Sequence, residues 1–186
     1  MVLLSERAEI IHKQYKLDEI NRIENIMSAR NAYKNVGNDP NRYRPSAEAL
    51  HRRLVKGNGL YFVNNIVDTL NLVSLESGIS IGGYDLQTIK GEITFGLGKK
   101  DEVYQGIGKG ILNITSLPVL RDSVGPFGTP TSDSERTKIC PTTNQVLFVF
   151  FDFGFYPGLH LTLDNCERYL KCYCFACEIQ RDIINC

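Results

Sequence analysis

The residues best equipped for chemistry lie in one polar run, TSDSERT, which spans residues 131–137. In one interpretation, the guanidinium of Arg136 binds an anionic group and the hydroxyls of the run orient that group. In the other, the run is a surface turn in which Asp133 or Ser134 bonds to the local backbone. Both interpretations stay open on the sequence, and each needs the surrounding elements to hold the run in place.

Histidine-based catalysis finds little support. The chain has three histidines, and none stands in a recognisable nucleophile context, which disfavours a Ser-His or Cys-His hydrolase. We expect His12 and His51 to be exposed, because both fall in polar helical stretches. The glycines at 106, 108 and 110 do not form a phosphate-binding motif and predict a tight turn between short strands. Catalysis would rest on carboxylates, hydroxyls, backbone dipoles or the substrate itself.

Six cysteines raise the question of a metal site, since Cys172, Cys174 and Cys177 have the ligand-like spacing C-x-C-x-x-C. However, apolar residues and cysteines recur every three or four positions there, which predicts an amphipathic helix over 163–180. On a helix, Cys172 and Cys174 project about 200° apart and could not easily hold one ion. We therefore expect buried cysteines that act as small hydrophobic residues, and no metal.

Composition and charge limit the classes of function. With 186 residues, 42% hydrophobic and 23% charged, the chain is long enough for one domain with its own core. Lysine and arginine balance aspartate and glutamate at 21 each, which excludes binding of nucleic acid by bulk charge alone. No apolar run approaches the roughly 18 residues of a membrane span, and the N-terminus turns charged too soon for a secretory signal. We expect a cytoplasmic protein with no membrane partner.

The charge is nevertheless uneven, because the first 60 residues carry eleven basic and seven acidic side chains. The densest basic stretch, residues 42–56, offers Arg52, Arg53 and Lys56 as candidate phosphate contacts. The alternative is a solvated helix face, on which Glu48, Arg52 and Lys56 line the outer side at i, i+4 spacing.

Periodicity and turn signals predict the elements that must position these residues. Residues 3–34 read as one or two helices, Ser46 caps a second helical region that ends at Gly57, and a third helix runs from 64 or 65 to a stop at Gly78. Strands are expected at 93–97, 117–120 and 146–151, the last fully buried because both of its faces are apolar. Helices at both termini around a glycine-rich β core predict an α+β fold.

Three stretches together carry a family resemblance: RPSAEALHRRLVKG at 44–57, NNIVDTLNLVSLESGISIGGYDLQTIKGEI at 64–93, and DSERT at 133–137 followed by TTNQVLFV at 142–149. They resemble the free-standing relatives of the tRNA-editing B-three/B-four domain in the bacterial phenylalanyl-tRNA synthetase beta subunit. The resemblance covers residues 40–150 of a single domain, between an N-terminal helical segment, 1–39, and a C-terminal helix, 151–186. It implies a three-layer α/β fold with an unusual β-sandwich core.

The resemblance also implies a connection with tRNA. In the synthetase, this domain hydrolyses tyrosine wrongly attached to the phenylalanine tRNA by means of a positioned water, with little side-chain acid or base chemistry. Its polar pocket residues are absent here, since Leu70, Gly82 and the Cys140-Pro141 pair occupy the matching positions. We expect a pocket that is roomier at Gly82 and more apolar at Leu70.

These observations predict a free-standing editing-type domain that binds an aminoacyl-tRNA end or a related ligand, weakly and with strong salt dependence. If it is an enzyme, it hydrolyses a mischarged aminoacyl ester without a metal or organic cofactor. The alternative is a non-catalytic RNA-, DNA- or ligand-binding module that kept the scaffold and lost the chemistry. The site would lie in a cleft between the helix at 64–77 and the β core, and its candidate lining residues are Asn71, Gly82, Gly83, Asp133, Ser134 and Arg136.

Overall fold

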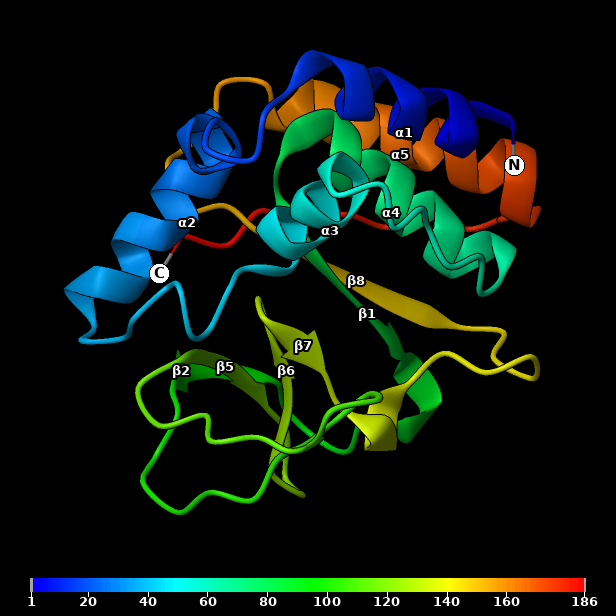
Figure 1. Cartoon of the computed structure of the whole chain (residues 1–186). Coiled ribbons are helices and arrows are strands. Elements are labelled where there is room, and N and C mark those ends of the chain that lie inside the picture. Colours follow the sequence, from blue (N-terminus) through cyan, green and yellow to red (C-terminus); the bar gives the residue numbers. More distant parts are fainter. Residues whose placement is uncertain (1, 186) are drawn as a thin grey trace.

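The computed structural model describes residues 2–185, and its helices gather on one side of the strands (Figure 1). A two-stranded sheet lies beneath the helices, and a four-stranded sheet lies beyond it, so the chain forms three layers (Figure 1). This arrangement confirms the predicted α+β fold with helices at both termini. The α-helices are α1 Val2–Gln14, α2 Glu24–Asn35, α3 Ser46–Val55, α4 Asn65–Ser77 and α5 Leu159–Cys174.

Helix α4 has both of the ends that its sequence predicts. The side chain of Asn64 accepts a hydrogen bond from the N–H of Val67, 2.9 Å away, and so caps the first turn. Gly78 ends the helix with a φ of +74°, a left-handed conformation that costs a residue without a Cβ little. Local signals therefore fix the helix that packs against the β core.

Helix α3 begins one residue earlier than predicted. Ser46 is the first helical residue rather than the N-cap, a position that Pro45 occupies. The N–H of Ser46 donates to the carbonyl oxygen of Pro130, 2.7 Å away. A distant turn thus satisfies one of the free N–H groups at the start of this helix and ties it to the β core.

A hydrophobic core joins the helices, with α4 packed against α1, α3 and α5. It buries apolar side chains from all four helices, as expected for amphipathic helices that share one core. Its members are Leu4, Ile11, Leu54, Leu72, Val73, Leu75, Cys166, Tyr169 and Leu170. His51 also lies inside, 2% exposed, so its predicted exposure is wrong. Burial lowers the pKa of His51, and its Nδ1 atom lies 2.8 Å from the carbonyl oxygen of Ala47. His12 is exposed, as expected.

The strands form two antiparallel sheets and one short hairpin. Strand β1 pairs with β8 from Ser80 opposite Phe151 to Asp85 opposite Val146, and the larger sheet has the order β2-β5-β6-β7. The bounds are β1 Ser80–Asp85, β2 Thr94–Leu97, β3 Gln105–Gly106, β4 Gly110–Ile111, β5 Pro118–Arg121, β6 Pro126–Thr129, β7 Ser132–Asp133 and β8 Val146–Phe151. The predicted glycine turn is confirmed, because it joins β3 to β4.

Strand β8 lies where the sequence places it but is not fully buried. Only Phe151 is buried, and the other five residues are half-buried. A strand in a two-stranded sheet keeps one edge free, which explains why an apolar run here does not require complete burial.

The C-terminal helix is shorter than predicted. It ends at Cys174, because Phe175 adopts a left-handed conformation with a φ of +56°. Cys166 is buried as expected, but Cys172 and Cys177 are exposed, so the prediction of uniformly buried cysteines is wrong. Cys186 lies outside the described residues. Within residues 2–185, no three His, Cys, Asp or Glu side chains are arranged to hold a metal ion, and no helix has the length and apolarity needed to cross a membrane.

Candidate functional site

Two residues of the predicted pocket, Asp133 and Gly83, meet at the junction of the two sheets. Strand β1 pairs with β8 along one edge, and on its other edge the N–H of Gly83 donates to Oδ2 of Asp133, 3.2 Å away. Asp133 belongs to β7, the edge strand of the larger sheet. Its carboxyl group therefore holds the edges of the two sheets together.

The surroundings of Asp133 make its carboxyl group unusual. Burial raises its pKa to about 7, although the Gly83 N–H and the charge of Lys109 act in the opposite direction. Lys109, in the turn between β3 and β4, donates from Nζ to the carbonyl oxygen of Thr131. Burial lowers the pKa of Lys109, while the charge of Asp133 raises it. At neutral pH this carboxyl group can both accept and release a proton, a property that is common at functional sites.

Tyr84 occupies the space that the predicted pocket assigns to Gly82. Its side chain lies on the same face of β1, two residues further on, and its hydroxyl reaches between Gly82 and Gly128. A Cβ atom at either glycine would overlap that hydroxyl. The expectation of a roomier pocket at Gly82 is therefore wrong, because Tyr84 fills the room.

The hydroxyl of Tyr84 is buried close to the carboxyl group of Asp133. It is fully buried and meets no hydrogen-bond partner among residues 2–185. Burial raises its pKa well above the ordinary value, and the charge of Asp133 raises it further. Tyr84 thus stays protonated beneath the Asp133 carboxyl.

The predicted cleft between α4 and the β core is closed at Gly83. Side chains of Leu70, Ile139 and Phe148 surround its Cα, and the Cδ1 atom of Leu70 lies 2.5 Å from where a Cβ would stand. Leu70 makes this region apolar, as expected. Asn71 is half-exposed, and its side chain makes no hydrogen bond within the described part of the chain. The structure therefore does not bond Asn71 to Gly83 or Asp133.

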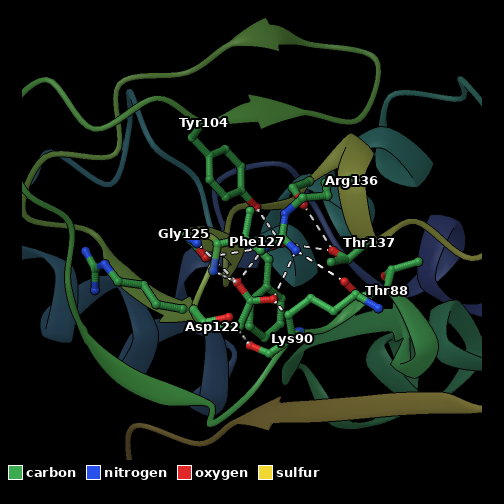
Figure 2. A network of polar contacts seen from close by, with 12 residues as sticks. Thr88, Lys90, Tyr104, Asp122, Gly125, Phe127, Arg136 and Thr137 are labelled. Carbon is green, nitrogen blue, oxygen red and sulfur yellow. Dashed lines mark hydrogen bonds and ion pairs between the residues drawn. The ribbon is translucent and has the colours of Figure 1, made fainter.

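Arg136 already holds an anion, namely Asp122. Figure 2 shows the pair, in which Nη2 donates to Oδ1 across 2.9 Å and Nη1 to Oδ2 across 3.0 Å. Arg136 also donates to the carbonyl oxygens of Thr88 and Gly125, each 3.3 Å away. Four acceptors thus occupy its guanidinium, which argues for a structural role rather than ligand binding.

The surroundings of Asp122 keep its carboxyl group ionised, as a partner of Arg136 requires. Burial acts to raise its pKa, but the hydrogen bonds from Arg136 and from three backbone N–H groups outweigh it and lower the pKa to about 2. Those N–H groups belong to Lys90, Val124 and Gly125. Ser134 is likewise engaged inside the fold, where its Oγ lies 3.0 Å from Oγ1 of Thr137. Of the three predicted site residues in the polar run, Asp133, Ser134 and Arg136, only Asp133 remains a candidate for ligand contact.

Arginine side chains of α2 and α3 contact one buried carboxylate, that of Glu48. Glu48 has no exposed side-chain surface, so its predicted place on the outer face of α3 is wrong. Arg30 of α2 donates from Nη1 to both of its oxygens, across 3.0 and 2.8 Å, and Arg52 donates from Nε across 2.7 Å. The Nε atom of Arg44 lies 3.8 Å from the same carboxylate. The face of α3 that its charge spacing predicts to be solvated is therefore turned toward α2.

The other two predicted phosphate contacts differ from each other. Arg53 donates to the carbonyl oxygens of Asn58 and Gly59 and stacks over the ring of Tyr61, 3.9 Å from its centroid. Lys56 is exposed and makes no ion pair within the described residues. Phosphate binding by Arg52, Arg53 and Lys56 stays a prediction.

Two hollows on the described surface are lined by residues other than these candidates. One, of about 490 Å³, is lined by Gln14, Tyr15, Glu19, Arg22, Ile23 and Glu24. The other, of about 470 Å³, is lined by Asp164, Glu167, Arg168, Lys171, Cys172 and Arg181.

The model of a known protein family matches most of this chain. The family model for the B3/4 domain, the domain of the phenylalanyl-tRNA synthetase beta subunit, matches residues 28–153. The match takes in most of α2, the helices α3 and α4 and all the strands, and with them Asp133, Glu48 and Arg30. The comparison with curated proteins gave no match. Membership suggests tRNA-related binding. Because the match covers well over half of its length, this chain belongs to the B3/4 domain family.

Proposed function

We propose that this protein is a free-standing editing-type domain that binds the aminoacylated end of a tRNA, or a related aminoacyl ester, at Asp133. One observation carries the proposal: Asp133, a half-buried residue, holds its buried carboxyl group, with a pKa of about 7, at the junction of two sheets and close enough to Lys109 for their charges to interact. The family supports the tRNA connection.

An aminoacyl ester is complementary to this pair of groups. Its α-ammonium group suits the carboxylate of Asp133, and its ester carbonyl oxygen is an acceptor for the ammonium group of Lys109. The Gly83 N–H holds the carboxylate in place, since it donates to Oδ2. A ligand that lacks the amino acid offers neither group, so the site would distinguish a charged tRNA end from an uncharged one.

Hydrolysis at this site would use a bound water. A carboxylate with a pKa near 7 suits a general base at neutral pH, so Asp133 would accept a proton as the water oxygen bonds to the ester carbon. The ester C–O bond then breaks, and the ribose oxygen leaves with the proton that Asp133 returns. The three histidines do not serve this step, since His12 and His51 contact backbone carbonyl oxygens and His160 lies on α5.

A non-catalytic binding module is the second candidate. Two observations favour it, because Leu70 closes the predicted cleft at Gly83 and Asp122 occupies the guanidinium of Arg136. Such a module would bind the aminoacylated tRNA end through Asp133 and Lys109 and would release it without hydrolysing the ester.

The test compares charged and uncharged forms of the same tRNA. We expect the wild-type protein to bind the aminoacylated form more tightly, and Asp133→Asn and Lys109→Gln to reduce that preference at least tenfold. Equal affinity of the wild-type protein for both forms would overturn the proposal. A deacylation assay over a panel of correctly and wrongly charged tRNAs then separates the two candidates, because only the enzyme releases the amino acid.

A further inference from the structure

We propose that Arg44 and Arg52 form a binding site for a phosphate group of the RNA backbone, and that the buried carboxylate of Glu48 holds them in position. The inference rests on the proposed function, since the phosphate belongs to the bound RNA. It names a contact that the aminoacyl site around Asp133 does not provide.

The cluster around Glu48 has an excess of positive charge. Three guanidinium groups, those of Arg30, Arg44 and Arg52, face one carboxylate within 4.0 Å. Among residues 2–185, no other acidic side chain pairs with these three arginines. A net charge of two remains when Glu48 is ionised, and a bound anion would balance part of it.

The three arginines differ in how many of their terminal nitrogens already donate hydrogen bonds. Both terminal nitrogens of Arg30 are occupied, because Nη1 donates to Glu48 and to the carbonyl oxygen of Pro40, and Nη2 donates to Asn41. Arg52 contacts Glu48 through Nε, and its two terminal nitrogens donate to no group within the described residues. Arg44 likewise approaches Glu48 through Nε. The outward ends of Arg44 and Arg52 are therefore free to donate.

Position and exposure favour an external anion. Glu48 lies in the first turn of α3 and Arg52 one turn further on the same face, and Arg44, which precedes the helix, approaches the same carboxylate. The side chain of Arg44 is 46% exposed and that of Arg52 is 20% exposed. Both converge on the same buried carboxylate, which limits their motion before any ligand arrives and lowers the entropic cost of binding.

The chemistry fits a phosphodiester. Its two unbridged oxygens match the paired N–H groups of a guanidinium, and two guanidinium groups can share one phosphate. Arg53 is a weaker candidate for this contact, because the carbonyl oxygens of Asn58 and Gly59 occupy its donors and its planar face lies over Tyr61.

The experiment measures the affinity for a tRNA acceptor-stem hairpin as a function of KCl concentration. Each phosphate contact contributes a log–log slope of roughly −0.9 for a duplex. We expect Arg44→Gln and Arg52→Gln each to weaken binding and the double variant to flatten the slope by about 1 to 2. Arg168→Gln, which removes an exposed arginine of α5, is the matched control and should leave both values unchanged.

Lysine variants separate charge from geometry. Arg44→Lys combined with Arg52→Lys keeps two cations but loses the paired N–H groups, so the salt slope should stay near the wild-type value while the affinity falls several-fold. Arg44→Gln tests the site even if an Arg52 variant is unstable, because the side chain of Arg44 is more exposed than that of Arg52. Thermal melting of each variant verifies that it folds.

The outcomes separate this inference from the proposed function. If the wild-type protein bound neither the uncharged nor the aminoacylated hairpin at any salt concentration, both would be overturned. Normal binding that the double glutamine variant leaves unchanged in affinity and slope would overturn the Arg44–Arg52 site alone. An equal effect of Arg168→Gln would also overturn it, because the contribution would then be unspecific charge.

Discussion

The N–H of Gly83 donates to the carboxyl group of Asp133 across 3.2 Å, and this bond joins the edge of β1 to β7 of the larger sheet. A side chain, rather than a further strand, therefore connects the two sheets at this point. Because the carboxyl group is drawn into the junction, burial raises its pKa to about 7. The same feature that makes Asp133 suitable for binding and proton transfer therefore has a cost in stability.

Replacement of Asp133 with asparagine should reveal this cost as a function of pH. In the unfolded chain an aspartate ionises near pH 4, whereas the folded protein keeps the proton up to about pH 7. The contribution of Asp133 to stability is therefore fully present below pH 4 and is lost as the pH rises to 7. We expect Asp133→Asn to be more stable than the wild-type protein by about 1–2 kcal/mol at pH 8, because asparagine can still accept the Gly83 N–H.

Urea unfolding at pH 4, 5.5, 7 and 8 measures this difference. The two proteins should be nearly equal at pH 4 and should diverge steadily above it. A difference that does not change with pH would show that the Asp133 carboxyl titrates normally in the folded protein.

Arg136→Gln should act mainly on stability. The substitution leaves the buried carboxylate of Asp122 without its two charged hydrogen bonds, and breaking one side of a buried pair costs about 3 kcal/mol or more. Urea unfolding at pH 7 gives this loss. Lys138→Gln is the control, because Lys138 forms an exposed pair with Glu135 nearby, and we expect it to leave stability nearly unchanged.

The pH dependence of the Arg136 effect has the opposite sign to that of Asp133. The pKa of Asp122 is lowered to about 2, so its contribution is present above pH 4 and is lost as the pH falls toward 2. The gap between the wild-type protein and Arg136→Gln should therefore narrow as the pH falls from 4 to 2. A gap that stays constant over that range would mean that Asp122 is not the partner that matters.

Local features of this fold follow directly from the sequence. The helix start at 64 or 65, the stop at Gly78 and the strand at 146–151 depend on neighbours within a few residues, and all three agree with the structure. Non-local pairings are different. Arg136 is 14 residues from Asp122, and Glu48 is 18 residues from Arg30, and no local pattern indicates that these groups meet.

The same reasoning explains the outcome at the candidate site. The junction of Gly83 with Asp133 joins residues 50 positions apart, and only the family resemblance brought them into one expected pocket. The filling of Gly82 by Tyr84 was missed although the two are neighbours on one strand face. An aromatic residue two positions from a glycine was the available signal, because side chains at i and i+2 lie on the same face.

Gly82→Ala should destabilise the protein through a clash with Tyr84. The added methyl group would overlap the hydroxyl, which Gly128 confines from the other side, and overpacking of this kind costs about 1–3 kcal/mol. Tyr84→Phe removes the nearest overlapping atom, the hydroxyl, although Cζ and Cε2 of the ring would still lie 2.5 and 2.9 Å from the new Cβ. Gly82→Ala should therefore cost about 1 kcal/mol less in a Tyr84→Phe background than in the wild-type protein.

A double-mutant cycle by urea unfolding of the four proteins measures this coupling. Tyr84→Phe alone should be close to neutral or stabilising, because its hydroxyl is buried without a partner in the described structure. Strictly additive effects of the two substitutions would contradict the tight contact between Tyr84 and Gly82.

Discrimination between tyrosine and phenylalanine esters should be weak. A site that bonds a substrate hydroxyl can discriminate by about 10⁴–10⁵, but it needs a polar partner for that hydroxyl. Leu70 is apolar and packs on Gly83, Tyr84 fills the space at Gly82, and the thiol of Cys140 donates to the carbonyl oxygen of Lys138. We expect affinities within about tenfold for the phenylalanine tRNA charged with either amino acid.

Filter binding with both charged forms, followed by a deacylation time course, measures this ratio. Tyrosine release should be absent or slow, and any release should show little preference over phenylalanine. Leu70→Thr, which places a hydroxyl at the apolar position that packs on Gly83, is the informative variant, since a gained preference for the tyrosyl ester would locate the amino-acid side chain beside α4. Rapid and selective release of tyrosine by the wild-type protein would instead show that another polar group of this chain binds the substrate hydroxyl.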